Sequence, residues 1–234
     1  MIEIKNVTKK YGDKVAVDNM SFTVNDGDIF AFIGHNGAGK TTLIKAIVGI
    51  HDFDNGDIII NGSSIKDDPI SCKKDMAFVP DNPEIYENMK AIDFINFICD
   101  MYEIDEDTRN NNITKYAKMF EIENNLGDTI NSFSHGMKQK ITLIAALAHN
   151  PKILIMDEPF VGLDPKAVFD MKELMRDMVK EGKTIFFSTH ILDVAEKLCT
   201  KVAIIKNGKL VKEGSMKDIK GDKSLEKVFL ELEQ

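Results

Sequence analysis

Short runs of apolar residues recur along the chain, and polar or turn-forming residues separate them. The runs are rich in Ile, Val and Phe, as buried strands usually are. Residues 166–181, which lie between two of the runs, predict a helix. Strands that alternate with helices favour a parallel sheet covered by helices. The runs that we assign to strands of this sheet are residues 29–33, 76–79, 153–156, 184–187 and 202–205.

Other segments predict antiparallel pairing. The chain opens with a strand pattern at residues 2–7, and residues 57–62 predict a hairpin. Asn207 and Gly208 lie between two apolar runs, where this dipeptide forms tight two-residue turns. The last segment, residues 224–233, predicts a short amphipathic helix. We therefore expect an N-terminal antiparallel β subdomain beside the mainly parallel sheet.

The middle of the chain has a different pattern. Residues 91–98 and 116–120 carry apolar side chains at helical spacing, which predicts helices. We expect one α/β domain over residues 1–234. Within it, residues 1–80 and 136–234 form the α/β core, and residues 81–135 form an inserted helical subdomain.

The segment after the strand at 29–33 has the pattern of a phosphate-binding loop. Gly34, Gly39, Lys40 and Thr41 fit G-x-x-x-x-G-K-[ST] between a strand and a helix. Such a loop directs backbone N–H groups and a helix N-terminus at anionic oxygens. Lys40 should reach the β- and γ-phosphates, and the Thr41 hydroxyl should bind Mg²⁺. The expected nucleotide-binding residues here are Gly34, Asn36, Gly37, Ala38, Gly39, Lys40, Thr41 and Thr42.

Two carboxylates follow the apolar run at 153–156. Asp157 and Glu158 stand at the C-terminal end of that strand, where open α/β sheets bind their ligands. Asp157 is suited to hold Mg²⁺, which prefers oxygen ligands. Glu158 is suited to take a proton from an attacking water. We therefore expect ATP and Mg²⁺ as cofactors.

Composition bears on partners and compartment. The formal net charge is −8, so the chain has no overall electrostatic attraction to a nucleic-acid backbone. The three cysteines show no zinc-ligand spacing. The N-terminus lacks the layout of a signal peptide, and no uncharged apolar run approaches the length of a membrane span. We expect a soluble cytoplasmic protein and no nucleic-acid partner.

Taken together, the motifs resemble the nucleotide-binding subunits of ATP-binding cassette (ABC) transporters over nearly the whole chain. They occur in the order found in that family. They comprise Tyr11 at the adenine-stacking position, the phosphate loop, residues 79–81 at the Q-loop, residues 133–139 at the signature, Asp157 with Glu158, residues 161–164 at the D-loop, and Ser188, Thr189 and His190 at the H-loop.

The resemblance implies further site residues. Ser134 and Gly136 would bind the γ-phosphate held by an opposite subunit, so that two subunits close head-to-tail around two ATP molecules. Asp164 would belong to the same nucleotide site, and His190 would contact the γ-phosphate. Tyr11 would stack on adenine. On its own, Ser134 would be read as a simple N-cap.

The sequence departs from the family pattern at two motifs. Asp81 stands where the Q-loop usually has glutamine, and it could bind Mg²⁺ through its carboxylate. Asn82 is the alternative if the loop is shifted by one residue. In the signature, His135 replaces a glycine and Met137 a glutamine. We expect His135 to face solvent.

The resemblance implies an ATPase subunit that powers transport by a separate polytopic permease. The signature variant resembles those of exporters. The permease contact would lie around residues 81–102, including residues 83–86, and the subunit would be cytoplasmic and peripheral on the inner face of the membrane. The second ATP-binding subunit would make a homodimer or a heterodimer. The alternative is a soluble ABC-type ATPase that acts on nucleic acid or ribosomes.

Overall fold

Two sheets and three groups of helices make up the protein, as seen in a computed structural model that describes residues 1–83 and 85–233. The larger sheet has six strands in the order β10-β9-β3-β8-β7-β6. All neighbours in it are parallel except β9 and β10. Its strands are β3 (Ile29–Ile33), β6 (Met76–Val79), β7 (Ile153–Asp157), β8 (Thr184–Thr189), β9 (Lys201–Lys206) and β10 (Lys209–Ser215).

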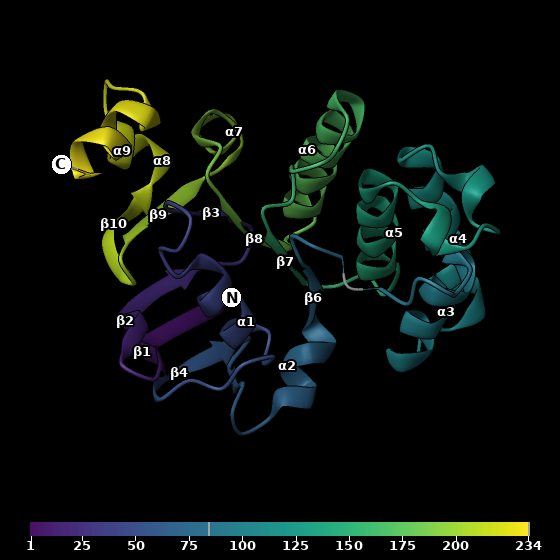
Figure 1. Ribbon diagram of the computed structural model, residues 1–234, viewed down its shortest axis with the longest axis horizontal. Coiled ribbons are helices and arrows are strands. Elements are labelled where there is room, and N and C mark those ends of the chain that lie inside the picture. The colour runs from purple at the N-terminus through teal and green to yellow at the C-terminus, as the bar shows by residue number, and fades with distance from the viewer. Residues whose placement is uncertain (84, 234) are drawn as a thin grey trace.

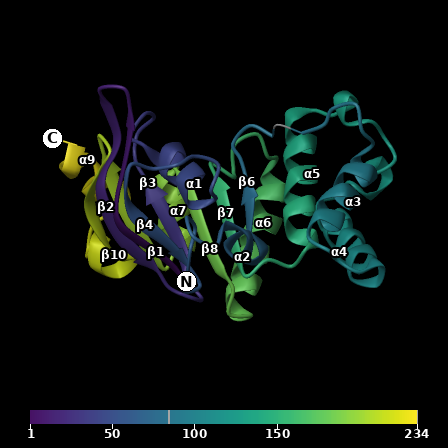
Figure 2. The same cartoon turned by 90° about the horizontal axis from the view of Figure 1, so that it is seen from below.

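The smaller sheet is antiparallel and has the strand order β2-β1-β4-β5. Its strands are β1 (Ile2–Tyr11), β2 (Lys14–Val24), β4 (Asn55–Ile60) and β5 (Ser63–Ser64). It lies at one end of the molecule, on the opposite side from α3 and α4 (Figure 2). The expected α/β fold, with a mainly parallel sheet and an N-terminal antiparallel sheet, is therefore confirmed.

The larger sheet separates two hydrophobic cores. Because side chains alternate along a strand, Phe30 and Phe32 point to one face of β3, whereas Ala31 and Ile33 point to the other. The first face packs against α1 (Lys40–Ile47) and the antiparallel sheet. There the ring of Phe22 stacks on Phe30 and Phe32, with centroids 5.5 and 5.6 Å apart.

Helices from the second half of the chain cover the other face. The side chains of Leu154, Met156 and Phe187 pack there with apolar residues of these helices. The helices of this layer are α6 (Pro165–Lys180), α7 (Leu192–Leu198), α8 (Met216–Lys220) and α9 (Leu225–Glu233).

A third group of helices stands beside β6, away from the antiparallel sheet (Figure 1). It consists of α3 (Ala91–Met101), α4 (Glu106–Met119) and α5 (His135–Ala148), with short 3₁₀ turns at Glu123–Asn125 and Ile130–Ser132 between α4 and α5. Helix α5 contacts α3, α4 and also β6, so it connects this group to the sheet. Helix α2 (Pro69–Asp75) precedes β6.

The helices of the described residues also bear on the expectation that no segment spans a membrane. None of the helices within residues 1–83 and 85–233 has both the length and the apolar character needed to cross a bilayer. Within the expected permease contact at residues 83–86, Glu84 lies outside the described part of the chain.

Candidate functional site

The phosphate loop joins β3 to α1, and its backbone is closely packed. Gly39 has a φ of +106°, and a Cβ on it would lie 2.4 Å from the carbonyl oxygen of Ala16. A side chain is therefore excluded at this position. Gly39 is also the N-cap of α1 and has no side chain with which to cap the first turn. The N–H groups at this end of the helix need another partner, and an anion can supply it.

A cavity of about 310 Å³ lies over this loop. Nine of the residues expected to bind or process nucleotide line it. Lys14 and Ala16 complete the lining, while Gly34 and Ala38 of the loop are buried and do not line it. The nine are Tyr11, Asn36, Gly37, Gly39, Lys40, Thr41, Thr42, Asp81 and Glu158.

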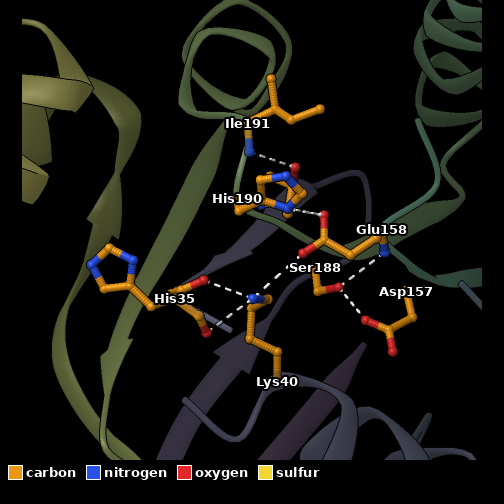
Figure 3. A network of polar contacts seen from close by, with 9 residues as sticks. His35, Lys40, Asp157, Glu158, Ser188, His190 and Ile191 are labelled. Atoms are coloured by element: carbon orange, nitrogen blue, oxygen red, sulfur yellow. Dashed lines mark hydrogen bonds and ion pairs between the residues drawn. The ribbon is translucent and has the colours of Figure 1, made fainter. Parts of the chain in front are cut away.

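The ammonium of Lys40, a residue that lines this cavity, contacts oxygen atoms of Gly34, His35 and Glu158 (Figure 3). It donates to the carbonyl oxygens of Gly34 at 2.6 Å and His35 at 3.3 Å. It also lies 3.4 Å from Oε1 of Glu158, and the Lys40 side chain is only 6% exposed. A phosphate in the cavity would compete with the two carbonyl oxygens for the ammonium, because a phosphate oxygen carries a negative charge and a carbonyl oxygen does not.

Glu158 is placed between Lys40 and His190. Its Oε2 accepts a hydrogen bond from the backbone N–H of His190 at 3.3 Å and lies 2.9 Å from Nδ1 of that ring. Its Oε1 is buried and, among the described residues, makes no hydrogen bond besides the ion pair with Lys40. Glu158 also has a left-handed backbone, with φ +47°. Such a conformation costs about 1–3 kcal/mol and is often found at functional sites.

Asp157 lies behind Glu158 and is 2% exposed. A second cavity, of about 420 Å³, is lined by Asp157, Asp81 and Thr41, the three residues expected to bind the metal. Asp81 and Thr41 also line the first cavity. Burial, and then the negative charges of Asp157 and Glu158, raise the pKa of the Asp81 carboxyl. A divalent cation would relieve that repulsion.

The donor set fits Mg²⁺ bound together with phosphate. Among the described residues, no group of three or more His, Cys, Asp or Glu side chains is arranged to hold a metal ion. Mg²⁺ commonly takes one or two protein carboxylates, and substrate phosphates and waters complete its shell. The pairing of acidic side chains with the Thr41 hydroxyl beside a phosphate loop matches that arrangement.

Ser134, Gly136 and Asp164 are not among the residues that line either cavity of this chain. Ser134 is the N-cap of α5, and its hydroxyl accepts from the N–H of Met137 at 3.3 Å. Asp164 is the N-cap of α6: it accepts from the N–H of Ala167 at 2.8 Å and lies 3.1 Å from the ammonium of Lys140. These two interactions, the first above all, hold the pKa of Asp164 below its usual range.

Tyr11 and His135 are both exposed. Tyr11 is 47% exposed, and the ammonium of Lys9 lies 5.2 Å from its ring centroid. His135 is exposed, as expected from the sequence. Its ring also lies against Gly162, where a Cβ would be 2.6 Å from Cδ2 of His135.

Three contacts at the site were not expected from the sequence. The Ser188 hydroxyl contacts both Asp157 and Glu158. The ring of Phe229, on α9, lies 4.9 Å from that of His35 in the phosphate loop. Nε2 of Gln139, on α5, lies 3.5 Å from the carbonyl oxygen of Pro80, next to Asp81. Of these three contacts, only that of Ser188 had a signal in the sequence, namely a polar residue directly after the apolar strand pattern at 184–187.

Replacing Gly136 with alanine is expected to destabilise the protein by about 1–3 kcal/mol. Alanine favours a helix by up to about 1 kcal/mol over glycine. Here, however, the new Cβ would lie 2.7 Å from the carbonyl oxygen of Gly162. The start of α5 must therefore move away from the loop that follows β7. Chemical denaturation of both proteins measures the change.

Gly127→Ala is the matched control. Gly127 lies between α4 and α5, its φ is not positive, and a Cβ there would have open space around it. We expect this control to be neutral or slightly stabilising. Equal stability of the two alanine variants would show that the contact between Gly136 and Gly162 is unimportant.

Comparisons with known proteins agree on one family. A sequence profile described as ABC transporter matches residues 17–161. The ABC-type transporter ATP-binding protein EcsA of Bacillus subtilis is 32% identical over 237 residues, which cover 99% of this chain and 96% of EcsA. The Nod factor export ATP-binding protein I of Burkholderia orbicola is 31% identical over 214 residues, which cover 92% of this chain and 70% of that protein.

Solved structures show the same likeness. A structure described as the ATP-binding subunit of an ABC transporter has a TM-score of 0.96 and 32% identity, and each chain is covered in full. The cassette MJ0796, solved as a dimer in a post-hydrolysis state with ADP and Pi, has a TM-score of 0.84 and 25% identity, covering 92% of this chain and 99% of that one.

Proposed function

The chain belongs to the ABC transporter family, as an ATP-binding ATPase domain, and from that premise we propose that it powers transport by a separate membrane permease. One observation carries the proposal. The phosphate-loop residues Lys40 and Thr41 share a single cavity with Glu158, which is the combination that ATP hydrolysis requires.

The residues that line the cavity, together with His190, each have a separate role in the reaction. The loop N–H groups and Lys40 bind the phosphates, with the Lys40 ammonium leaving the carbonyls of Gly34 and His35. Glu158 accepts the proton of the attacking water, and His190, whose Nδ1 lies 2.9 Å from Oε2 of Glu158, orients that carboxylate and reaches the γ-phosphate. Tyr11 stacks on adenine at the rim.

Thr41, Asp157 and Asp81 are the residues that would hold Mg²⁺. When bound, the cation neutralises charge on the transferred phosphoryl group. The pKa of Asp81 is raised first by burial and then by the charges of Asp157 and Glu158, and a cation would offset that repulsion, which supports including Asp81 in this set.

A second subunit completes the site in this proposal. Ser134 and Gly136 lie at the N-terminus of α5 and do not line the cavities of their own chain. A helix N-terminus favours anions, so this one is available for the γ-phosphate of a partner in a two-fold dimer. Asp164 acts in the same contact by fixing the start of α6. The dimer reported for the cassette MJ0796 supports this arrangement.

The permease would dock on the helical unit that we assign to residues 81–135, which is set into a core of 1–80 and 136–234. Large apolar side chains are exposed there: Tyr86 is 61%, Phe97 40% and Met101 66% exposed. The bound subunit would be peripheral on the cytoplasmic face of the membrane. Export is the favoured direction, since relatives include a Nod factor export protein.

The first experiment is to tag the subunit, solubilise native membranes gently and identify what co-purifies by mass spectrometry. We expect a polytopic membrane protein at near-equal stoichiometry. Ribosomal or DNA-associated proteins in its place would instead favour a soluble ABC-type ATPase that acts on ribosomes or nucleic acid.

A further inference from the structure

Ser188 connects the two acidic residues at the end of β7. In the parallel pairing of β7 with β8, Ser188 lies opposite Asp157, and its side chain is fully buried. Its Oγ donates a hydrogen bond to Oδ1 of Asp157. The same Oγ accepts one from the backbone N–H of Glu158 at 3.0 Å. Figure 3 shows the hydroxyl between these two partners.

The chemistry of the partners fixes the direction of both bonds. A carboxylate only accepts, and a backbone N–H only donates, so the single hydroxyl proton must point to Asp157. The bond occupies Oδ1 and leaves Oδ2 of Asp157 for a cation in the cavity that this residue lines. Ser188 therefore selects the carboxylate oxygen that a metal ion meets.

The second bond acts on Glu158 through its backbone. Glu158 has a left-handed φ of +47°, which residues other than glycine rarely adopt. The bond from its N–H to Ser188 fixes the peptide that precedes this unusual φ. The direction in which the Glu158 side chain leaves the strand, toward Lys40 and His190, therefore depends on Ser188.

We propose that Ser188 is a positioning residue for ATP hydrolysis, which acts by orienting Asp157 toward a divalent cation and Glu158 toward the attacking water. This inference rests on the proposed function of the same site. Ser188 reaches the reacting groups through Asp157 and Glu158, as a supporting residue behind metal-binding and catalytic side chains.

The test compares Ser188→Ala, which removes the hydroxyl, with Ser188→Thr, which keeps it. Thr184→Val is the matched control: Thr184 is also fully buried on β8, but its hydroxyl lies near Asn25 and Asp26 at the other end of the strand. Four quantities are measured for each variant. They are kcat and KM for MgATP, the affinity of the ADP-bound protein for Mn²⁺ by electron paramagnetic resonance, and the melting temperature.

We expect Ser188→Ala to lower kcat and Mn²⁺ affinity roughly 10–100-fold, as loss of a residue behind a metal ligand typically does. The KM for MgATP should change much less, because the phosphate loop is untouched. Ser188→Thr should recover most of the lost kcat and Mn²⁺ affinity. Thr184→Val should keep both near the wild-type values even if it melts at a lower temperature.

Two results would overturn the inference. One is a Ser188→Ala protein that melts earlier but retains kcat and Mn²⁺ affinity, which would make Ser188 a structural core residue. The other is an equal loss of kcat in Thr184→Val, which would indicate a general effect on β8. A wild-type protein that binds Mn²⁺ with ADP but hydrolyses nothing would contradict the proposed function instead, and the Mn²⁺ affinity of Ser188→Ala would still decide the role of Ser188.

Discussion

Replacing Glu158 with glutamine is expected to lower the ATPase kcat roughly 10²–10⁴-fold, the range typical of losing a general base. Binding of MgATP should survive, because the phosphate loop is intact. It should even tighten slightly, since the Lys40 ammonium loses its ionic partner 3.4 Å away and is released more easily to phosphate. ATP-bound dimer should therefore accumulate, and light scattering with MgATP measures it.

The control for this variant is Glu173→Gln. Glu173 is a surface residue of α6 that pairs with Arg176, so its loss should leave kcat unchanged. If Glu158→Gln remains monomeric with MgATP, the two-subunit arrangement is wrong. If it hydrolyses ATP at the wild-type rate, Glu158 is not the base.

Stability is expected to fall by about 3 kcal/mol between pH 6.5 and pH 4 because of His149 alone. His149 is buried at the end of α5 and stacks on Tyr102 at a centroid distance of 3.7 Å. Burial lowers its pKa from 6.5 to about 4. In this window the unfolded chain binds a proton that the folded chain does not, so the free energy of unfolding rises with pH. The stability that depends on neutral His149 is fully present above pH 6.5 and is lost below pH 4.

His149→Phe isolates this effect, because phenylalanine keeps the ring stack but cannot titrate. Urea denaturation at a series of pH values gives the free energy of unfolding of both proteins. We expect the two curves to diverge as the pH falls from 6.5 to 4, with the wild type losing more stability. If the two curves stay parallel between pH 6.5 and pH 4, burial does not lower the pKa of His149.

Strong local patterns were sufficient to predict most of the fold. The apolar runs predicted the parallel strands to within a residue or two, and Asn207 with Gly208 forms the expected hairpin between β9 and β10. The phosphate-loop motif predicted where β3 ends and α1 begins, because its glycines and lysine have positions that the backbone requires. These features depend on residues close together in sequence.

Contacts between distant segments were harder to predict. Ser188 and Asp157 meet only because β8 pairs with β7 in one particular register. His149 and Tyr102 meet only because α5 packs on α3.

A local signal was overlooked at Asp164, whose position directly before Pro165 is typical of a helix N-cap. Its nucleotide-binding role stays a prediction.

The position of β3 in the sheet bears on how the protein is made. β3 is synthesised well before its two neighbours, β8 and β9. A nascent chain that ends before Thr184 carries the phosphate-loop sequence without either strand that holds it in place. Phe30 and Phe32 then lack the ring of Phe186 on β8, against which both pack, so we expect this segment to depend on chaperone protection on the ribosome. ATP contributes to folding stability only after the last strands have joined the sheet.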